Sequence, residues 1–191
     1  ILSKIGVYDV AINPDDSNII YAAGFYADHG KVLVTRDGGK SWVEIYNEAA
    51  TQNAVRAIAL NPSNTQQLVI GMSSGNIIRS DDGGTNWRLL ANFEDRTNRM
   101  RFQNGALYAM FQTKGLFKST DAGSSFASLT ESLRPSDPNK LYYTSDILVG
   151  NFSQMAIANG NRALIYMTTE SGVYKTVDEG RRWTKLAIPI K

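Results

Sequence analysis

One eight-residue pattern occurs four times in this chain and restricts what the chain can fold into. Each copy has a hydroxyl residue, an Asp two positions later, a Gly two positions after the Asp, and an aromatic residue at its end. The copies are residues 35–42, 80–87, 119–126 and 176–183, so the Asp residues stand 45, 39 and 57 positions apart. Recurrence at such a period is typical of repeat architectures. We therefore expect four similar structural units.

Strand-like sequence lies on both sides of each copy. Residues 31–34 precede the first copy and residues 43–45 follow it, and both runs are rich in branched apolar residues. Such runs joined by an Asp/Gly segment predict a β-hairpin, with the Asp accepting backbone hydrogen bonds and the Gly taking positive φ. The aromatic residue is expected to fold beneath the turn. We predict a structural role, in four separate turns, for Asp37, Gly39, Trp42, Asp82, Gly84, Trp87, Asp121, Gly123, Phe126, Asp178, Gly180 and Trp183.

The pattern resembles the Asp-box, or BNR repeat. This repeat occurs in bacterial sialidases, sortilin-type receptors, some xyloglucan-degrading hydrolases, and photosystem II assembly factors with related exported bacterial proteins. The resemblance covers nearly the whole chain, and it departs where Phe126 replaces Trp and Arg182 replaces a small polar residue. It implies an all-β fold, a β-propeller of four-stranded antiparallel blades. It leaves the function open, because the Asp-box is structural in every branch of the family.

Two further strand-like runs precede each hairpin, so each repeat predicts the four strands of a propeller blade. The expected blades are residues 5–46, 53–90, 98–129 and 148–186 of a single unit over residues 1–191. Four blades either close on themselves or form part of a larger propeller, and the sequence leaves both open.

Composition narrows the class of partner. The chain has 20 basic and 18 acidic residues, a balance that gives no electrostatic case for nucleic acid. It has no Cys and one His, so no thiolate or multi-His metal site is expected, and neither is a cofactor or a membrane span. The chain begins at Ile1, within a strand pattern, which indicates a processed or truncated product. We expect an exported bacterial protein, periplasmic or extracellular, with a membrane tether in a missing N-terminal segment as a further option.

The connections at the two ends of the predicted propeller differ. The turns at one end repeat from blade to blade, whereas the loops at the other end vary, and variable loops on a fixed scaffold are the usual place for binding. Aromatic rings in these loops suit a sugar or a peptide, and inner-strand arginines suit an anionic group; ordinary packing and solvation are the alternative. The candidate binding residues are Tyr26, His29, Tyr46, Arg56, Arg99, Arg101, Tyr142 and Tyr143.

Two functions follow from this sequence. The first is a non-enzymatic module that binds a protein or a glycan, or assists assembly, with no catalytic residue assigned. The second is a glycoside hydrolase, which would need a pair of carboxylates on the variable loops. The Arg-Ile-Pro motif of sialidases is absent near the first blade, so this alternative is xyloglucanase-like. Its candidate carboxylates are Asp28, Glu48, Glu94, Asp95, Asp137, Asp146 and Glu170.

Overall fold

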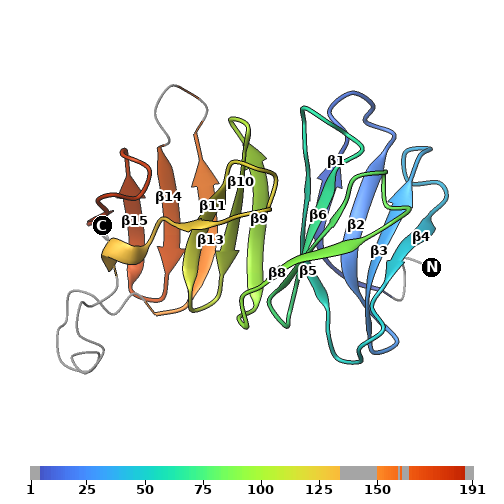
Figure 1. The fold of residues 1–191 in the computed structure, drawn as a ribbon, viewed down its shortest axis with the longest axis horizontal. Helices are drawn as coiled ribbons and strands as arrows, with labels where there is room; N and C mark the ends of the chain where they lie inside the picture. Colours follow the sequence, from blue (N-terminus) through green and yellow to red (C-terminus); the bar gives the residue numbers. More distant parts are fainter. Residues whose placement is uncertain (1–4, 134–149, 159, 161–163, 188–191) are drawn as a thin grey trace, which may run out of the picture.

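The structure is a computed structural model that describes residues 5–133, 150–158, 160 and 164–187. Four four-stranded antiparallel sheets make up nearly all of this part, and each sheet is a meander whose strands follow sequence order (Figure 1). A single 3-10 turn at Glu131–Leu133 is the helical element of the described residues. The all-β prediction with four antiparallel blades is confirmed. The candidates Tyr142, Tyr143, Asp137 and Asp146 lie outside the described residues.

The four sheets are called blades 1 to 4 in chain order. Blade 1 holds β1 (Gly6–Ile12), β2 (Ile20–Tyr26), β3 (His29–Thr35) and β4 (Val43–Asn47). Blade 2 holds β5 (Val55–Leu60), β6 (Leu68–Met72), β7 (Asn76–Ser80) and β8 (Arg88–Asn92). Blade 3 holds β9 (Thr97–Gln103), β10 (Ala106–Phe111), β11 (Gly115–Ser119) and β12 (Ala127–Ser128). Blade 4 holds β13 (Phe152–Ile157), β14 (Ile165–Thr169), β15 (Gly172–Thr176) and β16 (Thr184–Lys185).

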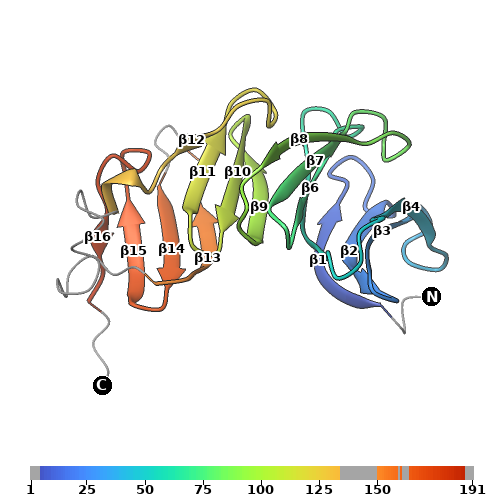
Figure 2. The same ribbon diagram turned by 60° about the horizontal axis from the view of Figure 1, so that its bottom comes forward.

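The blades lie face to face in a curved row with blades 1 and 4 at its ends (Figure 2). Their first strands, β1, β5, β9 and β13, form the inner side of the row, and their last strands form the outer side. We call the face that a blade turns to the preceding blade its leading face, and the opposite face its trailing face. Side chains alternate between these two faces along each strand.

Apolar side chains fill each of the three spaces between neighbouring blades. Ile58 and Ile70 on the leading face of blade 2 pack with Tyr21 and Val34 on the trailing face of blade 1. Blades 2 and 3 meet through a second core, where the rings of Phe93 and Phe111 stack with centroids 4.1 Å apart, and blades 3 and 4 meet through a third. The facing sides of neighbouring blades are thus buried against one another, as in stacked repeats.

A small hydrogen-bond network builds each repeated turn. In blade 3, the Ser119 hydroxyl donates to the Asp121 carboxylate at 2.7 Å and accepts from the Gly123 N–H at 2.7 Å. The same carboxylate accepts from the N–H of Ser125 at 2.8 Å. Matching bonds are present in the other three turns, from Thr35, Ser80 and Thr176. The four aspartates therefore hold four separate hairpins and do not meet in one site.

Each turn in blades 2 to 4 also touches the outer strand region of the preceding blade. A Cβ placed on Gly84 would meet the side chain of Ile45, and one placed on Gly123 would meet the side chain of Leu90. A Cβ on Gly180 would meet the backbone oxygen of Leu129. The indole N–H of Trp87 donates to the Ile45 carbonyl at 2.9 Å, and that of Trp183 donates to the Leu129 carbonyl at 2.8 Å. These turns therefore close their own hairpin and fix the distance to the neighbouring blade.

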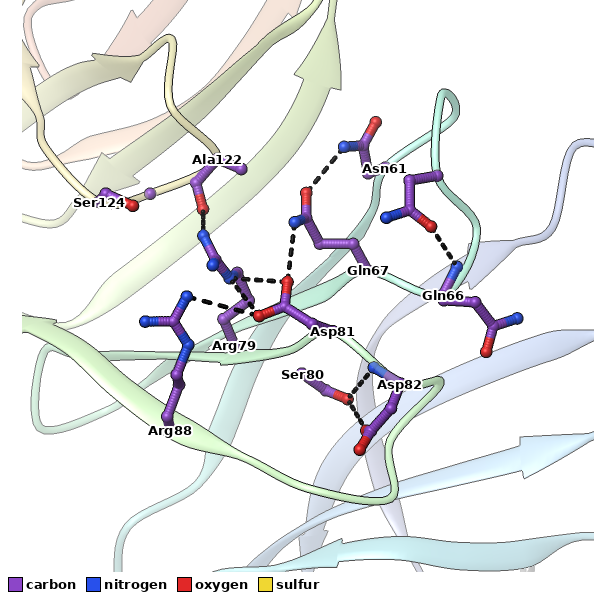
Figure 3. Close-up of polar contacts among 12 residues, drawn as sticks. Asn61, Gln66, Gln67, Arg79, Ser80, Asp81, Asp82, Arg88, Ala122 and Ser124 are labelled. Carbon is purple, nitrogen blue, oxygen red and sulfur yellow. Dashed lines mark hydrogen bonds and ion pairs between the residues drawn. The ribbon is translucent and has the colours of Figure 1, made fainter.

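A basic side chain reaches the same turn from the preceding blade. Arg79, on β7, donates to the carbonyl of Ala122 in the turn of blade 3 at 2.9 Å and pairs with Asp81, whose carboxylate also accepts from Gln67 (Figure 3). Lys118, on β11, pairs with Glu179 in the turn of blade 4 at 3.0 Å. In both contacts, a side chain on the trailing face of one blade binds the residue that directly follows the turn Asp of the next blade.

Acid should weaken this fold at a pH set by the turn carboxylates. Hydrogen bonds from Asn86 and Ser125 lower the pKa values of Asp82 and Asp121 to about 2. The unfolded chain takes up these protons at about pH 4, so it binds more protons than the folded chain between about pH 4 and 2. The stabilisation is therefore complete above about pH 4 and is lost as the pH falls towards 2. Urea unfolding at a series of pH values measures it, and a D82N/D121N variant should lose less stability over this range.

The contact between blades should show in one glycine substitution. Gly180 and Gly105 both have positive φ, +84° and +74°, but a Cβ on Gly105 would meet nothing within 4 Å. Both alanine variants carry the cost of positive φ, roughly 1–2 kcal/mol. Gly180→Ala should lose about 1–3 kcal/mol more, because the backbone of Leu129 cannot move aside. Equal losses in the free energy of unfolding would contradict the contact.

Candidate functional site

A β-bulge interrupts every inner strand near its first residues. The pairing of the first two strands skips one residue between Val7 and Asp9 in blade 1, and the same kind of shift occurs in the other three blades. A bulge adds one residue to a strand and turns its side chain away from the regular alternation. The bulged residues are Tyr8, Arg56, Asn98 and Ser153.

The four bulged residues come together in one open cleft on the inner side of the row. The cleft has a volume of about 240 Å³, and Arg96, Arg99 and Gln154 complete its lining. The Asn98 amide donates to the Phe152 carbonyl and accepts from the Arg96 guanidinium at 3.1 Å, which holds it between blades 3 and 4. Among the residues that the structure describes, three arginines and no carboxylate therefore line this cleft.

Arg56 is the least satisfied of these arginines. Its guanidinium carbon lies 4.0 Å from the centre of the Tyr8 ring, a cation–π contact between blades 1 and 2. Its Nε is buried and has no hydrogen-bond partner, and among the described residues no carboxylate forms an ion pair with it. A buried donor without a partner costs about 1–3 kcal/mol, so a ligand with an acceptor oxygen would gain from this position.

A buried carboxylate beside the cleft offsets part of its charge. Asp9 of blade 1 lies between Arg99 at 3.5 Å and Arg101 at 3.3 Å, both on β9 of blade 3, and it accepts from the N–H of Ile58. Arg99 also donates to Gln154 of blade 4 at 2.7 Å. The side chains of all four blades thus meet here, and the pair Arg56 and Arg96 retains its positive charge without a carboxylate partner in the described part of the chain.

A second cleft adjoins the first and shares Tyr8, Arg56 and Arg96 with it. Its volume is about 230 Å³, and its other lining residues are Phe25, Gln52, Ala54 and Ser73. Two of the predicted arginines, Arg56 and Arg99, therefore face these clefts, whereas Arg101 pairs with Asp9 and does not line them. We call the two clefts together the arginine cleft.

The other described candidates do not line the arginine cleft. The His29 ring bonds the Glu48 carbonyl at 2.8 Å through Nδ1. The Tyr46 hydroxyl donates to Glu48 at 2.7 Å and its ring packs edge-on against Trp87, and burial together with that carboxylate raises the pKa of Tyr46 well above its usual range. Tyr26 ends β2 and is 37% exposed. These three are not brought together with the arginines.

Most acidic loop residues accept hydrogen bonds within their own loop or from a neighbouring loop. Asp95 accepts from the N–H groups of Thr113 and Lys114 at 2.7 and 2.6 Å, and Glu170 accepts from the Asn151 amide at 2.6 Å. Asp28 accepts from the side chain of Gln52 at 2.8 Å, and Glu48 accepts from Tyr46. Glu94 has positive φ, as a turn residue. None of the five lines the arginine cleft.

Two further findings concern the described residues alone. They hold no group of three or more His, Cys, Asp or Glu side chains placed to bind a metal ion. They also contain no helix with the length and hydropathy needed to cross a membrane.

No protein-family model matches this chain. Over 165 residues it is 24% identical to a probable oligoxyloglucan-reducing end-specific xyloglucanase of Neosartorya fischeri, a match that covers 74% of this chain and 20% of that protein. The chain thus spans about a fifth of the length of this relative. Identity at this level leaves the family of the chain open.

Solved structures share the fold at low sequence identity. The GH74 enzyme of Niastella koreensis superposes with a TM-score of 0.66 at 20% identity, over 94% of this chain and 30% of that one. YCF48 from Cyanidioschyzon merolae superposes with a TM-score of 0.68 at 16% identity, over 98% of this chain and 57% of that one. YCF48 bound to a D1 peptide gives 0.54 at 13% identity, over 97% and 70%. These likenesses show that the four blades have the β-propeller fold.

Sequence reasoning missed Tyr8, Arg96, Asn98, Ser153 and Gln154 as lining residues. Tyr8, Asn98, Ser153 and Gln154 stand at or next to the start of an inner strand in the predicted blades, beside the variable loops. This position was the signal that could have pointed to them. Nothing in the residue pattern marks a bulge, so the direction of their side chains was not predictable.

Proposed function

We propose that this chain is a non-enzymatic binding module whose ligand is an anionic, extended segment of a protein partner held in the arginine cleft. The observation that carries the proposal is the cleft itself, where Arg56 and Arg96 have no carboxylate partner among the described residues while Tyr8 and Phe25 offer aromatic surface. Guanidinium groups bind carboxylates through two parallel hydrogen bonds. As part of the proposal, the repeated turns are Asp-boxes with a purely structural role.

A protein partner is favoured over a free sugar by the chemistry of the lining. Sugar sites present flat aromatic rings and neutral or acidic hydrogen-bonding groups, whereas here three arginines lie on the inner strands of blade 2 and blade 3 or just before them. The peptide bound to YCF48, a protein of the same fold, supports a peptide as the kind of ligand that such a scaffold accommodates. The identity of that peptide is not carried over to this chain.

Binding of an acidic peptide tests the proposal. A fluorescein-labelled hexaglutamate should bind the protein, and Arg56→Gln or Arg96→Gln should weaken binding by about tenfold or more, because each removes a guanidinium that has no carboxylate partner among the described residues. Arg88→Gln is the control, since Arg88 is an exposed arginine on the outer strand β8. Fluorescence anisotropy at two ionic strengths measures the affinity. If all three variants lost the same affinity, binding would depend on the net charge of the protein and not on the arginine cleft, and the proposal would be wrong.

A xyloglucanase-like hydrolase is the second candidate, supported by the relative from Neosartorya fischeri. The hydrogen bonds that Asp95 and Glu170 accept from neighbouring loops argue against the hydrolase, because a catalytic carboxylate must be free to exchange a proton with the substrate.

Incubation with xyloglucan oligosaccharides separates the two candidates. We expect no release of reducing sugar above that of a buffer blank. Turnover that is abolished by Asp95→Asn or Glu170→Gln, and kept by the exposed control Asp15→Asn, would replace the binding proposal with the hydrolase.

A further inference from the structure

Phe25 is an apolar residue at a position that is polar in the other three blades. It directly follows the residue that pairs with the inner strand just before the bulge. The matched positions in blades 2, 3 and 4 hold Ser73, Gln112 and Glu170. The Phe25 side chain is half-buried and belongs to none of the three cores between the described blades. The scaffold alone therefore does not require an aromatic ring here.

The two positions beside Phe25 in its sheet are glycines. Phe25 pairs with Gly6 on β1 and with Gly30 on β3, and neither neighbour has a side chain that could cover the ring. Phe25 lines the second cleft together with Tyr8, the bulged residue of β1. No side chain at these two cross-strand positions therefore separates the ring from a ligand in the cleft.

Two polar side chains of the second cleft are held by the protein itself. The Ser73 hydroxyl accepts from the Ala54 N–H at 2.8 Å and donates to the Ala54 carbonyl at 3.2 Å. The side-chain amide of Gln52 donates to the Asp28 carboxylate at 2.8 Å. With these groups engaged, aromatic rings and guanidinium groups are the main surface that the second cleft offers to a ligand.

The loops beside the second cleft are held in strained conformations. Ala27, Asp28 and Gln52 have φ values of +49°, +67° and +60°, although none of them is glycine. The Gln52 N–H donates to the Asp28 carbonyl at 2.8 Å, in addition to the side-chain bond between the same two residues. Strain of this kind is concentrated at ligand sites, and a site that is already ordered loses less entropy on binding. This side of the second cleft therefore has the properties of a pre-formed site.

The two clefts thus offer different chemistry on either side of Arg56. In the first cleft, the buried Nε of Arg56 has no partner among the described residues, so it favours an acceptor oxygen. In the second cleft, the rings of Phe25 and Tyr8 suit another ring in an offset or edge-on arrangement. Arg56 and Arg96 line both clefts, and guanidinium groups attract the face of an aromatic ring. An aromatic group is therefore favoured over an aliphatic one in the second cleft.

We propose, as a refinement that rests on the function proposed above, that the partner segment carries an aromatic side chain next to an acidic one. The carboxylate binds Arg56 and Arg96 in the first cleft, and the aromatic ring enters the second cleft beside Phe25. Phe25 is then a specificity-determining residue. It selects among acidic segments, whereas the arginines attract all of them.

Three acidic peptides of equal charge test this specificity. Each is a fluorescein-labelled hexapeptide with five Glu residues and with Phe, Leu or Gln at its fourth position. The Phe peptide should bind about tenfold more tightly than the Gln peptide, because its ring is withdrawn from water. It should bind about threefold more tightly than the Leu peptide, because only a ring gains the contacts with Phe25 and the arginines. Fluorescence anisotropy measures the three affinities.

Substitutions of Phe25 test its role as the selecting residue. Phe25→Ala should reduce the preference for the Phe peptide over the Gln peptide to about twofold or less. Phe25→Leu keeps an apolar side chain, and it should remove the smaller preference for Phe over Leu even if the alanine variant does not fold. Tyr26→Ala is the matched control and should keep both preferences, since Tyr26 ends the same strand, is 37% exposed and does not line the arginine cleft. Circular dichroism verifies that the variants fold.

The outcomes separate this inference from the function on which it rests. Equal binding of the three peptides, lost in Arg56→Gln, would overturn the aromatic specificity and leave the proposed function in place. A Leu peptide that binds as tightly as the Phe peptide would overturn it too, as would a preference for Phe that both Phe25 variants retain. Failure of every acidic peptide to bind would instead reject the proposed function itself.

Discussion

The contact between each repeated turn and the preceding blade is the interaction on which the rest of the structure depends. A single blade can bury one face only if its neighbour lies at a fixed distance. The turn sets that distance through a glycine and, in blades 2 and 4, also through an indole N–H. Gly180 shows how close the approach is, since even a methyl group there would meet the backbone of Leu129. The hydroxyl and carboxylate of the turn keep this glycine in its positive-φ conformation.

The curvature of the row then creates the arginine cleft. Because the first strands lie on the inner side, residues distant in sequence meet there, and the bulge in each of these strands turns one more side chain inward. The scaffold repeats, but the bulged residue does not: it is Tyr, Arg, Asn and Ser in turn. The residue type thus differs between blades at a position that takes no part in the repeated hydrogen bonds of the turns.

The sequence predicted the fold well because its signals are local. The turn pattern and the alternating apolar runs each depend on neighbours within a few residues, and the predicted all-β fold with four antiparallel blades is confirmed. The site was less predictable. Arg56 and Arg99 were expected on the inner side. A bulge, however, shifts the alternation of side chains by one residue, and the residue types at Tyr8 and Asn98 do not predict it. The predicted roles of His29 and Tyr46 stay predictions, and Tyr142 and Tyr143 lie outside the described residues.

The buried carboxylate of Asp9 has a consequence for how the chain acquires its structure. Its partner Arg101 stands 92 residues further along, on β9, so the charge has no counterion until blade 2 and the first strand of blade 3 have been made and brought into place. Closing so long a loop is slow, and an uncompensated buried carboxylate disfavours any intermediate that has docked only blades 1 and 2. A ribosome-bound chain ending in blade 2 would therefore keep β1 loosely attached, and the arrival of β9 would make assembly cooperative.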